Sequence, residues 1–554
     1  MRIRSIFGCI LWSYVLAMPW GADLSLAQSV AAVRDLNPQI SNAFPPVSAE
    51  NETTGASPEN WHKHLWESLP SEWLQDPNQV VLLEAYDQNN WKPLFITSGF
   101  EINPGVNVLL QRLENLEEEA IDHRPFKLDD LKQRIEKLEN LRLALSFEKE
   151  KDTVDIFRTA SAVDLQLAHT LIRFAETMNP YSRDLQMSGL LGKISMDEFL
   201  QEIEPPSLQY QSLVQALQKY RHFAEKVPQQ RLVQSQKLSP GDAGNAVRDL
   251  QKRLQQEGFY HGNISGTFDE TTKNAVLSFQ RYHNLDADGK VGQQTREWLN
   301  VSFQDKADMI ARALKLYRQS QTRRYQRFVW INIPQFTLEY HNEGKVEAVH
   351  RVIVGKASGK KIKLDGRMIG ENQTPTLTSA IEQVVINPRW YVGDRIRLEL
   401  SHEIAADPSY LERHGYVQMT SSRYPWGEPR LIQLPGPTNA LGQVRFDFPN
   451  SYAVYMHDTP NKYLFHRARR DFSHGCIRVE KAHQLAQELL SDDQNPAATK
   501  TDSYLATNRE TFLRLRQPVP IIIEYVPVTV NAKGDLVFCG DPYGWFEDRS
   551  NRKS

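Results

Sequence analysis

Two side chains able to carry out nucleophilic catalysis lie close together in the sequence. Cys476 stands in the segment Ser473-His474-Gly475-Cys476-Ile477-Arg478-Val479, and His457 precedes it, with fifteen residues (458–472) between His457 and Ser473. In Cys–His catalysis the thiolate attacks, and the imidazole takes and later returns the proton. A free thiol has a pKa of about 8.5, so it ionises near neutral pH only beside a cation or backbone N–H groups. Arg478 and the Gly475 backbone are placed to supply these.

The residues around the thiol have assignable roles. The backbone N–H groups of Gly475 and Cys476, with the Tyr455 hydroxyl, are candidates for an oxyanion hole, and a glycine lets the backbone approach a substrate closely. Arg478 either binds a substrate carboxylate in bidentate fashion or pairs with an acid that fixes the loop. Two residues away from Cys476 on a tight turn, His474 is expected to point away from the thiol, as a structural or substrate-contacting residue.

This pattern resembles a known signature. His457, a gap of fifteen residues and then Ser473-His474-Gly475-Cys476-Ile477-Arg478 is similar to the motif of the L,D-transpeptidases that crosslink bacterial peptidoglycan. The resemblance implies that Cys476 is the nucleophile and His457 the base, with the backbone carbonyl of Asp458 orienting the imidazole. It also implies ping-pong acyl transfer: the thiol attacks the third residue of a tetrapeptide stem, D-alanine leaves, and the amine of a second stem makes a 3→3 crosslink.

Other outcomes of the same chemistry stay open. Attack by water would make the protein an L,D-carboxypeptidase, and a lipoprotein acceptor would make it an anchoring enzyme. A Cys–His amidase or endopeptidase normally places Cys before His in the chain, whereas here His457 precedes Cys476. A non-catalytic peptidoglycan-binding protein is a further alternative, which the intact His–Cys pair disfavours. The resemblance also implies inactivation by carbapenems.

The composition of the whole chain limits the class of protein. With 554 residues the chain is long enough for three or four domains. A net charge of −3 offers no argument for nucleic-acid binding. Arg2 and Arg4 precede an apolar run (6–18), and a small-x-small pattern ends before Gln28, which predicts a signal peptide over 1–27, no transmembrane helix after its cleavage and a location in the periplasm or cell envelope.

Two cysteines follow the predicted signal peptide. Cys476 and Cys539 either form a disulfide or stay free, and a disulfide would block the predicted nucleophile. No set of side chains has the spacing of a zinc site, so neither a metal nor another cofactor is predicted. The oligomeric state is not determined by the sequence.

The N-terminal half of the mature chain is expected to be helical. Residues 28–60 are predicted to form a linker, and 61–237 a helical scaffold domain with apolar residues at helical spacing. The stripe of Val163, Leu167, Leu171 and Phe174 is expected to end at Asn179-Pro180.

Residues 238–300 form a compact pattern of their own. Val247, Leu250 and Leu254 predict a helix that stops near Gly258, and Asp269 is a good N-cap for a second helix. The order of these apolar and turn residues resembles a three-helix peptidoglycan-binding module, which implies peptidoglycan glycan and stem peptides as partners. The pattern consists of core and turn residues, so the glycan-contacting surface is not predicted.

The C-terminal half contains the motif. A connecting helix (301–326) precedes the predicted catalytic domain (327–530), whose short β runs and turns, among them a hairpin turn at Asn342-Glu343-Gly344, predict a β-rich sandwich or barrel-like core. Thr374-Pro375-Thr376 and Asn439-Ala440-Leu441-Gly442 resemble further blocks of the same family. The large members of the family carry a capping subdomain where this chain has an insert (388–437). Trp390 and Tyr391 in it are expected to face the site, with a core role for at least one of them. A tail (531–554) is expected to pack on a surface. The fold class is therefore multidomain α+β.

Overall fold

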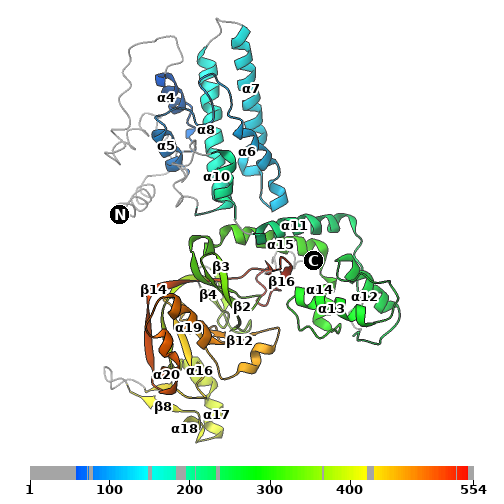
Figure 1. Cartoon of the computed structure of the whole chain (residues 1–554), viewed down its shortest axis with the longest axis vertical. Coiled ribbons are helices and arrows are strands. Elements are labelled where there is room, and N and C mark those ends of the chain that lie inside the picture. The colour runs from blue at the N-terminus through cyan, green and yellow to red at the C-terminus, as the bar shows by residue number, and fades with distance from the viewer. Residues whose placement is uncertain are drawn as a thin grey trace. The chain divides into compact units, whose positions relative to one another are not determined.

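The chain folds into two compact units. The structure is a computed structural model that describes residues 58–71, 73, 76, 79–147, 153–181, 195–205, 208–232, 237–364, 367–420, 429–531 and 533–546. The N-terminal unit comprises Met1–Glu114 and His123–Ile203, and the C-terminal unit comprises Asn115–Asp122 and Glu204–Ser554 (Figure 1). The predicted signal peptide, residues 28–57 of the predicted linker and residues 547–554 lie outside the described residues.

The N-terminal unit is helical. Its helices are α4 (Pro58–Glu67), α5 (Gln79–Gln88), α6 (Gly105–Glu114), η3 (Arg124–Phe126), α7 (Leu128–Phe147), α8 (Thr153–Met178) and α10 (Met196–Ile203). Helix α8 packs against α4, α5 and α7, and its predicted stripe of Val163, Leu167, Leu171 and Phe174 is buried. The helix ends at Met178, directly before Asn179-Pro180, as predicted. None of the described helices is both long and apolar enough to span a lipid bilayer.

The predicted scaffold domain (61–237) does not coincide with one unit. Helix α11 (Leu208–Lys226) groups with the C-terminal unit, where it packs along α15 (Phe303–Gln319). Arg318 of α15 donates hydrogen bonds to the Tyr210 hydroxyl of α11 at 2.8 Å and to the Glu119 carbonyl at 2.9 Å. Glu119 ends η2 (Leu116–Glu119). The apolar face of α11 is therefore buried by a partner that lies about a hundred residues further along the chain, which the local stripe did not reveal.

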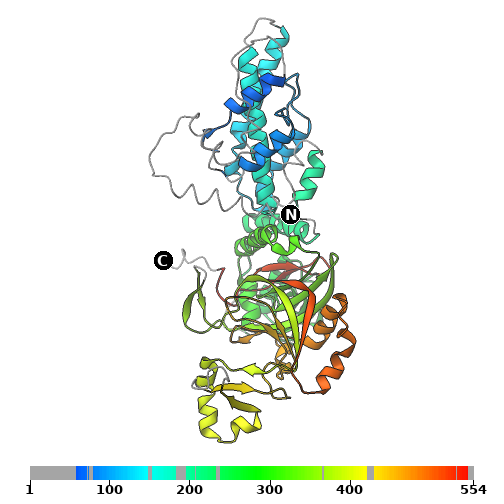
Figure 2. The same cartoon turned by 90° about the vertical axis from the view of Figure 1, so that its left-hand side faces the viewer.

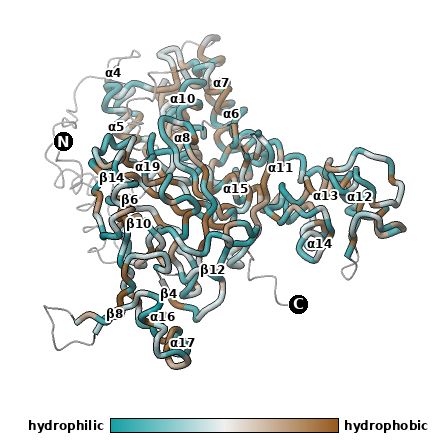
Figure 3. The backbone as a smooth tube through the Cα atoms, turned by 60° about the horizontal axis from the view of Figure 1, so that its bottom comes forward, coloured by the Kyte–Doolittle hydropathy of each residue, from teal (hydrophilic) through white to brown (hydrophobic). Residues whose placement is uncertain are grey.

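The predicted binding module consists of α12 (Asn245–Gln256), α13 (Glu270–Tyr282) and α14 (Gln293–Asn300). The Asp269 side chain caps α13 by accepting the Thr272 N–H at 2.8 Å, as predicted. Along α12 and α13 apolar and hydrophilic residues interleave (Figure 3), and the apolar ones form a separate small core. Gly258 follows α12 with a φ of 86°, a conformation that favours glycine.

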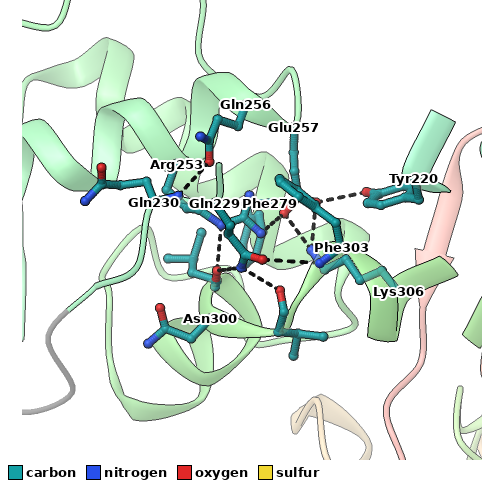
Figure 4. A network of polar contacts seen from close by, with 12 residues as sticks. Tyr220, Gln229, Gln230, Arg253, Gln256, Glu257, Phe279, Asn300, Phe303 and Lys306 are labelled. Carbon is teal, nitrogen blue, oxygen red and sulfur yellow. Dashed lines mark hydrogen bonds and ion pairs between the residues drawn. The ribbon is translucent and has the colours of Figure 1, made fainter. Parts of the chain in front are cut away.

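A buried ionic cluster joins the module to the connecting helix (Figure 4). Lys306 of α15 donates to both carboxylate oxygens of Glu257 at 2.7 Å, and Arg253 and the Tyr220 hydroxyl bind the same carboxylate. Burial acts to raise the pKa of Glu257, but Lys306 and Arg253 outweigh it and lower this pKa to about 2. Burial lowers the pKa of Lys306 to about 8, against the attraction of Glu257. The module is thus linked to α15 by the buried ion pair of Lys306 and Glu257.

The predicted catalytic domain contains a nine-stranded sheet. Its strands are β1 (Arg327–Asn332), β2 (Thr337–Asn342), β3 (Lys345–Gly355), β6 (Leu377–Ile386), β10 (Val444–Asp447), β11 (Met456–His457), β12 (Asp471–Ser473), β13 (Ile477–Val479) and β14 (Thr511–Glu524). The order is β12-β3-β13-β11-β10-β6-β14-β1-β2, and β2 also pairs with β3. Eight strands therefore close into a ring, which removes the free edges and confirms the predicted barrel-like core.

Outside the sheet and the insert, the described residues of this domain and its flanking segments contain nine further short elements. They are η5 (Gln321–Arg324), β4 (Lys361–Leu364), β5 (Arg367–Gly370), η6 (Lys462–His466), α19 (Ala482–Asp492), η7 (Ala498–Lys500), α20 (Thr501–Ala506), β15 (Val528–Val530) and β16 (Leu536–Phe538). Leucines and alanines of α19 are buried with the sheet residues in one core. The β2–β3 hairpin turns at Glu343 and Gly344, which have φ values of 48° and 76°, where a turn was predicted.

The insert forms a small lobe, yellow in Figure 2. It contains β7 (Trp390–Tyr391), α16 (Asp394–Glu399), α17 (Ser401–Ala406), α18 (Tyr410–Arg413), β8 (Tyr416–Met419) and β9 (Arg430–Gln433), with the three strands in the order β7-β9-β8. Asn439 holds its two ends together, because its buried side-chain amide donates to the carbonyls of Pro388, Gln433 and Leu434.

Candidate active site

Strand register brings the candidate residues together. Strand β11 pairs in parallel with β13, with Met456 opposite Ile477 and His457 opposite Arg478. Side chains alternate between the two faces of a strand. Because Met456 and Ile477 are fully buried in the core, Tyr455 and His457 on one strand and Cys476 and Arg478 beside them share the opposite face. This pairing places His457 and Cys476 on the same face of two neighbouring strands.

His457 is held as a neutral, oriented base. Its side chain is 5% exposed, and its Nδ1–H donates to the backbone carbonyl of Asp458 at 2.5 Å. This bond fixes the tautomer that leaves Nε2 free to accept a proton. Burial, followed by the charge of Arg478, lowers the pKa of His457 to about 3, although the carbonyls of Asp458 and Leu441 oppose the shift. This geometry matches the role predicted for the Asp458 backbone carbonyl, which is to orient the imidazole.

Cys476 is half-buried and is contacted by Tyr455. Burial raises the pKa of the Cys476 thiol, while hydrogen bonding by Tyr455 and the charge of Arg478 act to lower it. Burial likewise raises the pKa of Tyr455, so that its hydroxyl stays a donor, while Trp390 acts to lower this pKa. Thiol and imidazole are thus both neutral at rest, and a proton must move when the thiol attacks.

The Ser473 hydroxyl bridges the turn before Cys476 by two hydrogen bonds. The Ser473 hydroxyl donates to the Cys476 carbonyl at 2.5 Å and accepts the Gly475 N–H at 3.2 Å. Gly475 has a φ of 118°, which only glycine adopts without strain. The expected oxyanion hole therefore needs correction: the Gly475 N–H is already committed to Ser473, and the Cys476 N–H and the Tyr455 hydroxyl are left as donors.

The other side of this turn rests on Thr374. Its hydroxyl donates to the Gly475 carbonyl at 2.8 Å and accepts the Gly355 N–H at 2.9 Å. The Tyr543 hydroxyl donates to the Gly355 carbonyl at 2.6 Å and accepts the Thr374 N–H at 3.1 Å. The sequence showed Thr374 only as part of a threonine–proline block, and it placed Tyr543 in a tail without a role. Tyr543 is 8% exposed and packs in the barrel core.

The guanidinium of Arg478 has no carboxylate partner among the described residues. Its side chain forms no ion pair with a carboxylate of the described residues, and its buried Nε has no hydrogen-bond partner there. Nearby Arg445, in contrast, forms a bidentate pair with Asp447 at 2.6 and 2.9 Å. Of the two roles considered for Arg478, pairing with an acid of the loop is therefore absent among the described residues.

Asp458 is fixed by its side chain as well. Its carboxylate accepts the Gln443 N–H at 3.1 Å and pairs with Lys462. A Cβ at Gly442, where φ is 62°, would lie 2.5 Å from this carboxylate. Glycine is therefore required at 442 for the chain to approach Asp458, and Gly442 is a supporting residue that the sequence suggested only through its family-like block.

His474 and Trp390 connect the motif to the insert. His474 Nε2 lies 2.9 Å from Glu399 of α16 and 3.4 Å from Lys356 Nζ, so His474 points to the insert rather than to the thiol. Trp390 reaches the site through Tyr455. Tyr391 is 53% exposed, and its predicted place at the site stays a prediction. Neither aromatic is fully buried, so the expected core role is wrong.

The cysteines are free, and the described residues offer no metal site. Cys476 and Cys539 are not bonded to each other, and Cys539 is buried at the end of β16. Among the ranges that the structure describes, no group of three or more His, Cys, Asp and Glu side chains is arranged to hold a metal ion.

Two protein families match the chain. The L,D-transpeptidase catalytic domain matches residues 326–521, and the peptidoglycan binding domain matches residues 243–299. A protein of Haemophilus influenzae named "Putative L,D-transpeptidase" is 32% identical over 234 residues, which are 39% of this chain and 44% of that protein. The match thus spans less than half of this relative.

Further matches are shorter or more distant. The N-acetylmuramoyl-L-alanine amidase CwlM of Mycobacterium tuberculosis is 48% identical over 52 residues, 9% of this chain and 13% of that protein. A crystal structure of the L,D-transpeptidase of Xylanimonas cellulosilytica is 19% identical, with a TM-score of 0.19 over 54% of this chain and 100% of that one. On the family matches, residues 326–521 form a catalytic domain of the L,D-transpeptidase family and residues 243–299 a peptidoglycan-binding domain.

Proposed function

We propose that the protein is an L,D-transpeptidase that forms 3→3 crosslinks in peptidoglycan through a thioester on Cys476. The observation that supports the proposal is the pairing of β11 with β13, by which a neutral, oriented His457 shares one face of two neighbouring strands with Cys476. The catalytic-domain match supports the reaction class, and the binding-domain match supports peptidoglycan as partner. The site of action is then the cell envelope, outside the cytoplasm.

In the acylation step, the Cys476 sulfur attacks the carbonyl carbon of the third residue of a donor tetrapeptide. The thiol proton passes to His457 Nε2 as the carbon–sulfur bond forms, because both groups are neutral at rest. The tetrahedral intermediate collapses with cleavage of the peptide bond, and His457 returns the proton to the leaving amine of D-alanine. The Asp458 carbonyl holds the imidazole orientation through both transfers.

Two groups are available for the negative charge that develops on the substrate oxygen. The Cys476 N–H lies beside the sulfur in the chain, and the protonated Tyr455 hydroxyl contacts the thiol. The uncommitted guanidinium of Arg478 suits a carboxylate of the donor stem, because its planar fork matches a carboxylate in bidentate geometry.

In the second step, the side-chain amine of another stem attacks the thioester and loses its proton to His457, and the thiol is regenerated. The insert, tied to the motif through His474–Glu399 and Trp390–Tyr455, is suited to limit the entry of water during the lifetime of the thioester. If water attacks instead, the same site acts as an L,D-carboxypeptidase.

Intact-mass spectrometry of the purified protein with a disaccharide-tetrapeptide tests the proposal. We expect a thioester adduct on the wild type that is absent from Cys476→Ala, strongly slowed formation in His457→Ala, and dimeric muropeptides as product. Tripeptide without dimers would assign a carboxypeptidase. If neither the tetrapeptide nor a carbapenem gives an adduct, the catalytic mechanism is refuted and a wall-binding role remains.

A further inference from the structure

The peptide group between Gly475 and Cys476 is held by the Thr374 hydroxyl, and Thr374 is in turn held by the Tyr543 hydroxyl. A peptide group is planar, and in its trans form the C=O and N–H point in opposite directions. The Gly475 carbonyl is anchored by the Thr374 hydroxyl at 2.8 Å, and none of the peptide bonds between described residues is cis. The Cys476 N–H must therefore point away from Thr374.

The Cys476 N–H is the free donor of this peptide. No hydrogen-bond acceptor in the described part of the chain takes it, whereas the Gly475 N–H is bound to Ser473. A buried donor normally finds a partner. An unpaired N–H next to a nucleophilic sulfur is suited to receive the oxygen of an attacked carbonyl.

Thr374 has little freedom to release this peptide. Its hydroxyl accepts from Gly355 while it donates to Gly475, so both bonds set its rotamer. Strand β3 comes so close here that a Cβ at Gly355 would lie 1.9 Å from the Asn372 carbonyl oxygen. Only glycine allows this approach, which brings the Gly355 N–H within reach of Thr374.

Tyr543 holds both Thr374 and Gly355 in place. Its hydroxyl bridges the Gly355 carbonyl and the Thr374 N–H, and its own N–H is bound by the Tyr525 hydroxyl at 2.8 Å, which in turn donates to Asp541 at 2.5 Å. The rings of Tyr525 and Tyr543 stack with centroids 5.5 Å apart. Burial raises the pKa of Tyr543, so that its hydroxyl remains a donor.

We propose that Thr374 and Tyr543 are positioning residues for acyl transfer, which aim the Cys476 N–H at the oxyanion of the tetrahedral intermediate. The C-terminal segment is thereby a part of the catalytic apparatus, although it touches no reacting atom. This inference rests on the proposed acyl transfer but does not depend on the identity of the natural substrate.

The test uses Thr374→Val, which keeps the shape and removes the hydroxyl, and two reactions of the same thiol in the full-length protein. Acylation by p-nitrophenyl acetate builds an oxyanion, whereas alkylation by iodoacetamide does not. We expect Thr374→Val to slow acylation at least tenfold. This is less than the roughly 10²- to 10³-fold reduction in kcat that follows complete loss of one oxyanion-hole donor, because the Cys476 N–H is misaligned and not removed. The alkylation rate should stay within about twofold of wild type, because the thiol and its neighbours are unchanged.

Conservative variants separate positioning from folding. Thr374→Ser keeps the hydroxyl and is expected to restore acylation to within about threefold of wild type, while Tyr543→Phe should slow it about three- to tenfold, the effect of one lost hydrogen bond. The double variant should act much like Thr374→Val alone, because both act on one peptide. Thr376→Val, in the same segment, is the matched control.

Two outcomes would overturn the inference: acylation that is insensitive to Thr374→Val, or a parallel loss of alkylation, which would mean that the loop is merely displaced. Failure of the proposed function is a different result. In that case tetrapeptide gives no thioester with the wild type, while the ester still acylates Cys476 and reports on Thr374.

Discussion

Tyr455 and Cys476 stand side by side, directly before the paired residues of β11 and β13. Tyr455 acts to lower the thiol pKa against the effect of burial, and Trp390 of the insert acts to lower the pKa of the Tyr455 hydroxyl. The reactivity of the nucleophile is thus linked to a residue of the insert through a single phenol.

Removal of this phenol should make the thiol less acidic. In Tyr455→Phe the thiolate loses a donor, so we expect the rate of alkylation by iodoacetamide at pH 7 to fall about three- to tenfold, with the pH profile displaced upward. Tyr463→Phe, at a side chain that is 65% exposed, is the control. An unchanged profile would show that the contact does not affect the thiolate.

Arg478 should contribute to substrate binding more than to folding. Arg478→Gln removes a charge-assisted bidentate contact, for which a loss of about 2–3 kcal/mol, or 30- to 150-fold in kcat/KM, is typical. Arg478→Lys should recover only part of it, because an ammonium lacks the fork. Steady-state kinetics with tetrapeptides amidated at one carboxylate at a time check this. Amidation of the carboxylate that Arg478 binds should lower the kcat/KM of the wild type, but it should lower the kcat/KM of Arg478→Gln only slightly further. Equal losses in both proteins would assign the carboxylate to another residue.

His457 should make the catalytic domain sensitive to acid. Its folded pKa of about 3 lies below the ordinary value of 6.5, so between these values the unfolded chain binds a proton that the folded chain does not. Stability therefore falls as pH decreases from 6.5 towards 3 and is unaffected by this group above pH 7. At pH 5 the penalty is about 2 kcal/mol.

Urea unfolding at pH 7 and pH 5 measures this effect. The loss of stability between the two pH values should be about 2 kcal/mol smaller in His457→Gln than in the wild type. His402→Gln, an exposed histidine of the insert, should behave like the wild type. An identical pH dependence in all three proteins would mean that His457 titrates normally in the folded state.

The Lys306–Glu257 cluster should be essential for attachment of the binding module. Lys306→Met removes one partner of a fully buried pair and leaves Glu257 with Arg253 and Tyr220, for which a loss of about 3–5 kcal/mol is typical. We expect limited proteolysis to cut near residues 301–303 in this variant while Cys476 remains reactive. Lys273→Met, a surface lysine of the same module, serves as the control, and a protease-resistant Lys306→Met would show that apolar packing alone holds the module.

Much of the fold was predictable from local pattern. The stripe and end of α8, the Asp269 cap of α13, the hairpin turn at Gly344 and the barrel-like β region follow from periodicity, capping and turn chemistry, which act over a few residues. The assignment of α11 was not predictable, since its apolar face does not reveal which helix will cover it. Nor was the exposure of Tyr391, because burial of an aromatic residue in an insert depends on what packs against it.

By itself the sequence determined the chemical groups of the site and their order: a thiol in a glycine turn, an imidazole separated from Ser473 of that turn by fifteen residues, an arginine two positions beyond the thiol, and a binding module ahead of them. Only the tertiary structure decided how these groups are supported. Thr374, 101 residues before Gly475, holds the Gly475 carbonyl, and Tyr543 of the C-terminal segment holds Thr374. The neutral state of the thiol and imidazole likewise arises from desolvation, which exists only once the barrel closes around them.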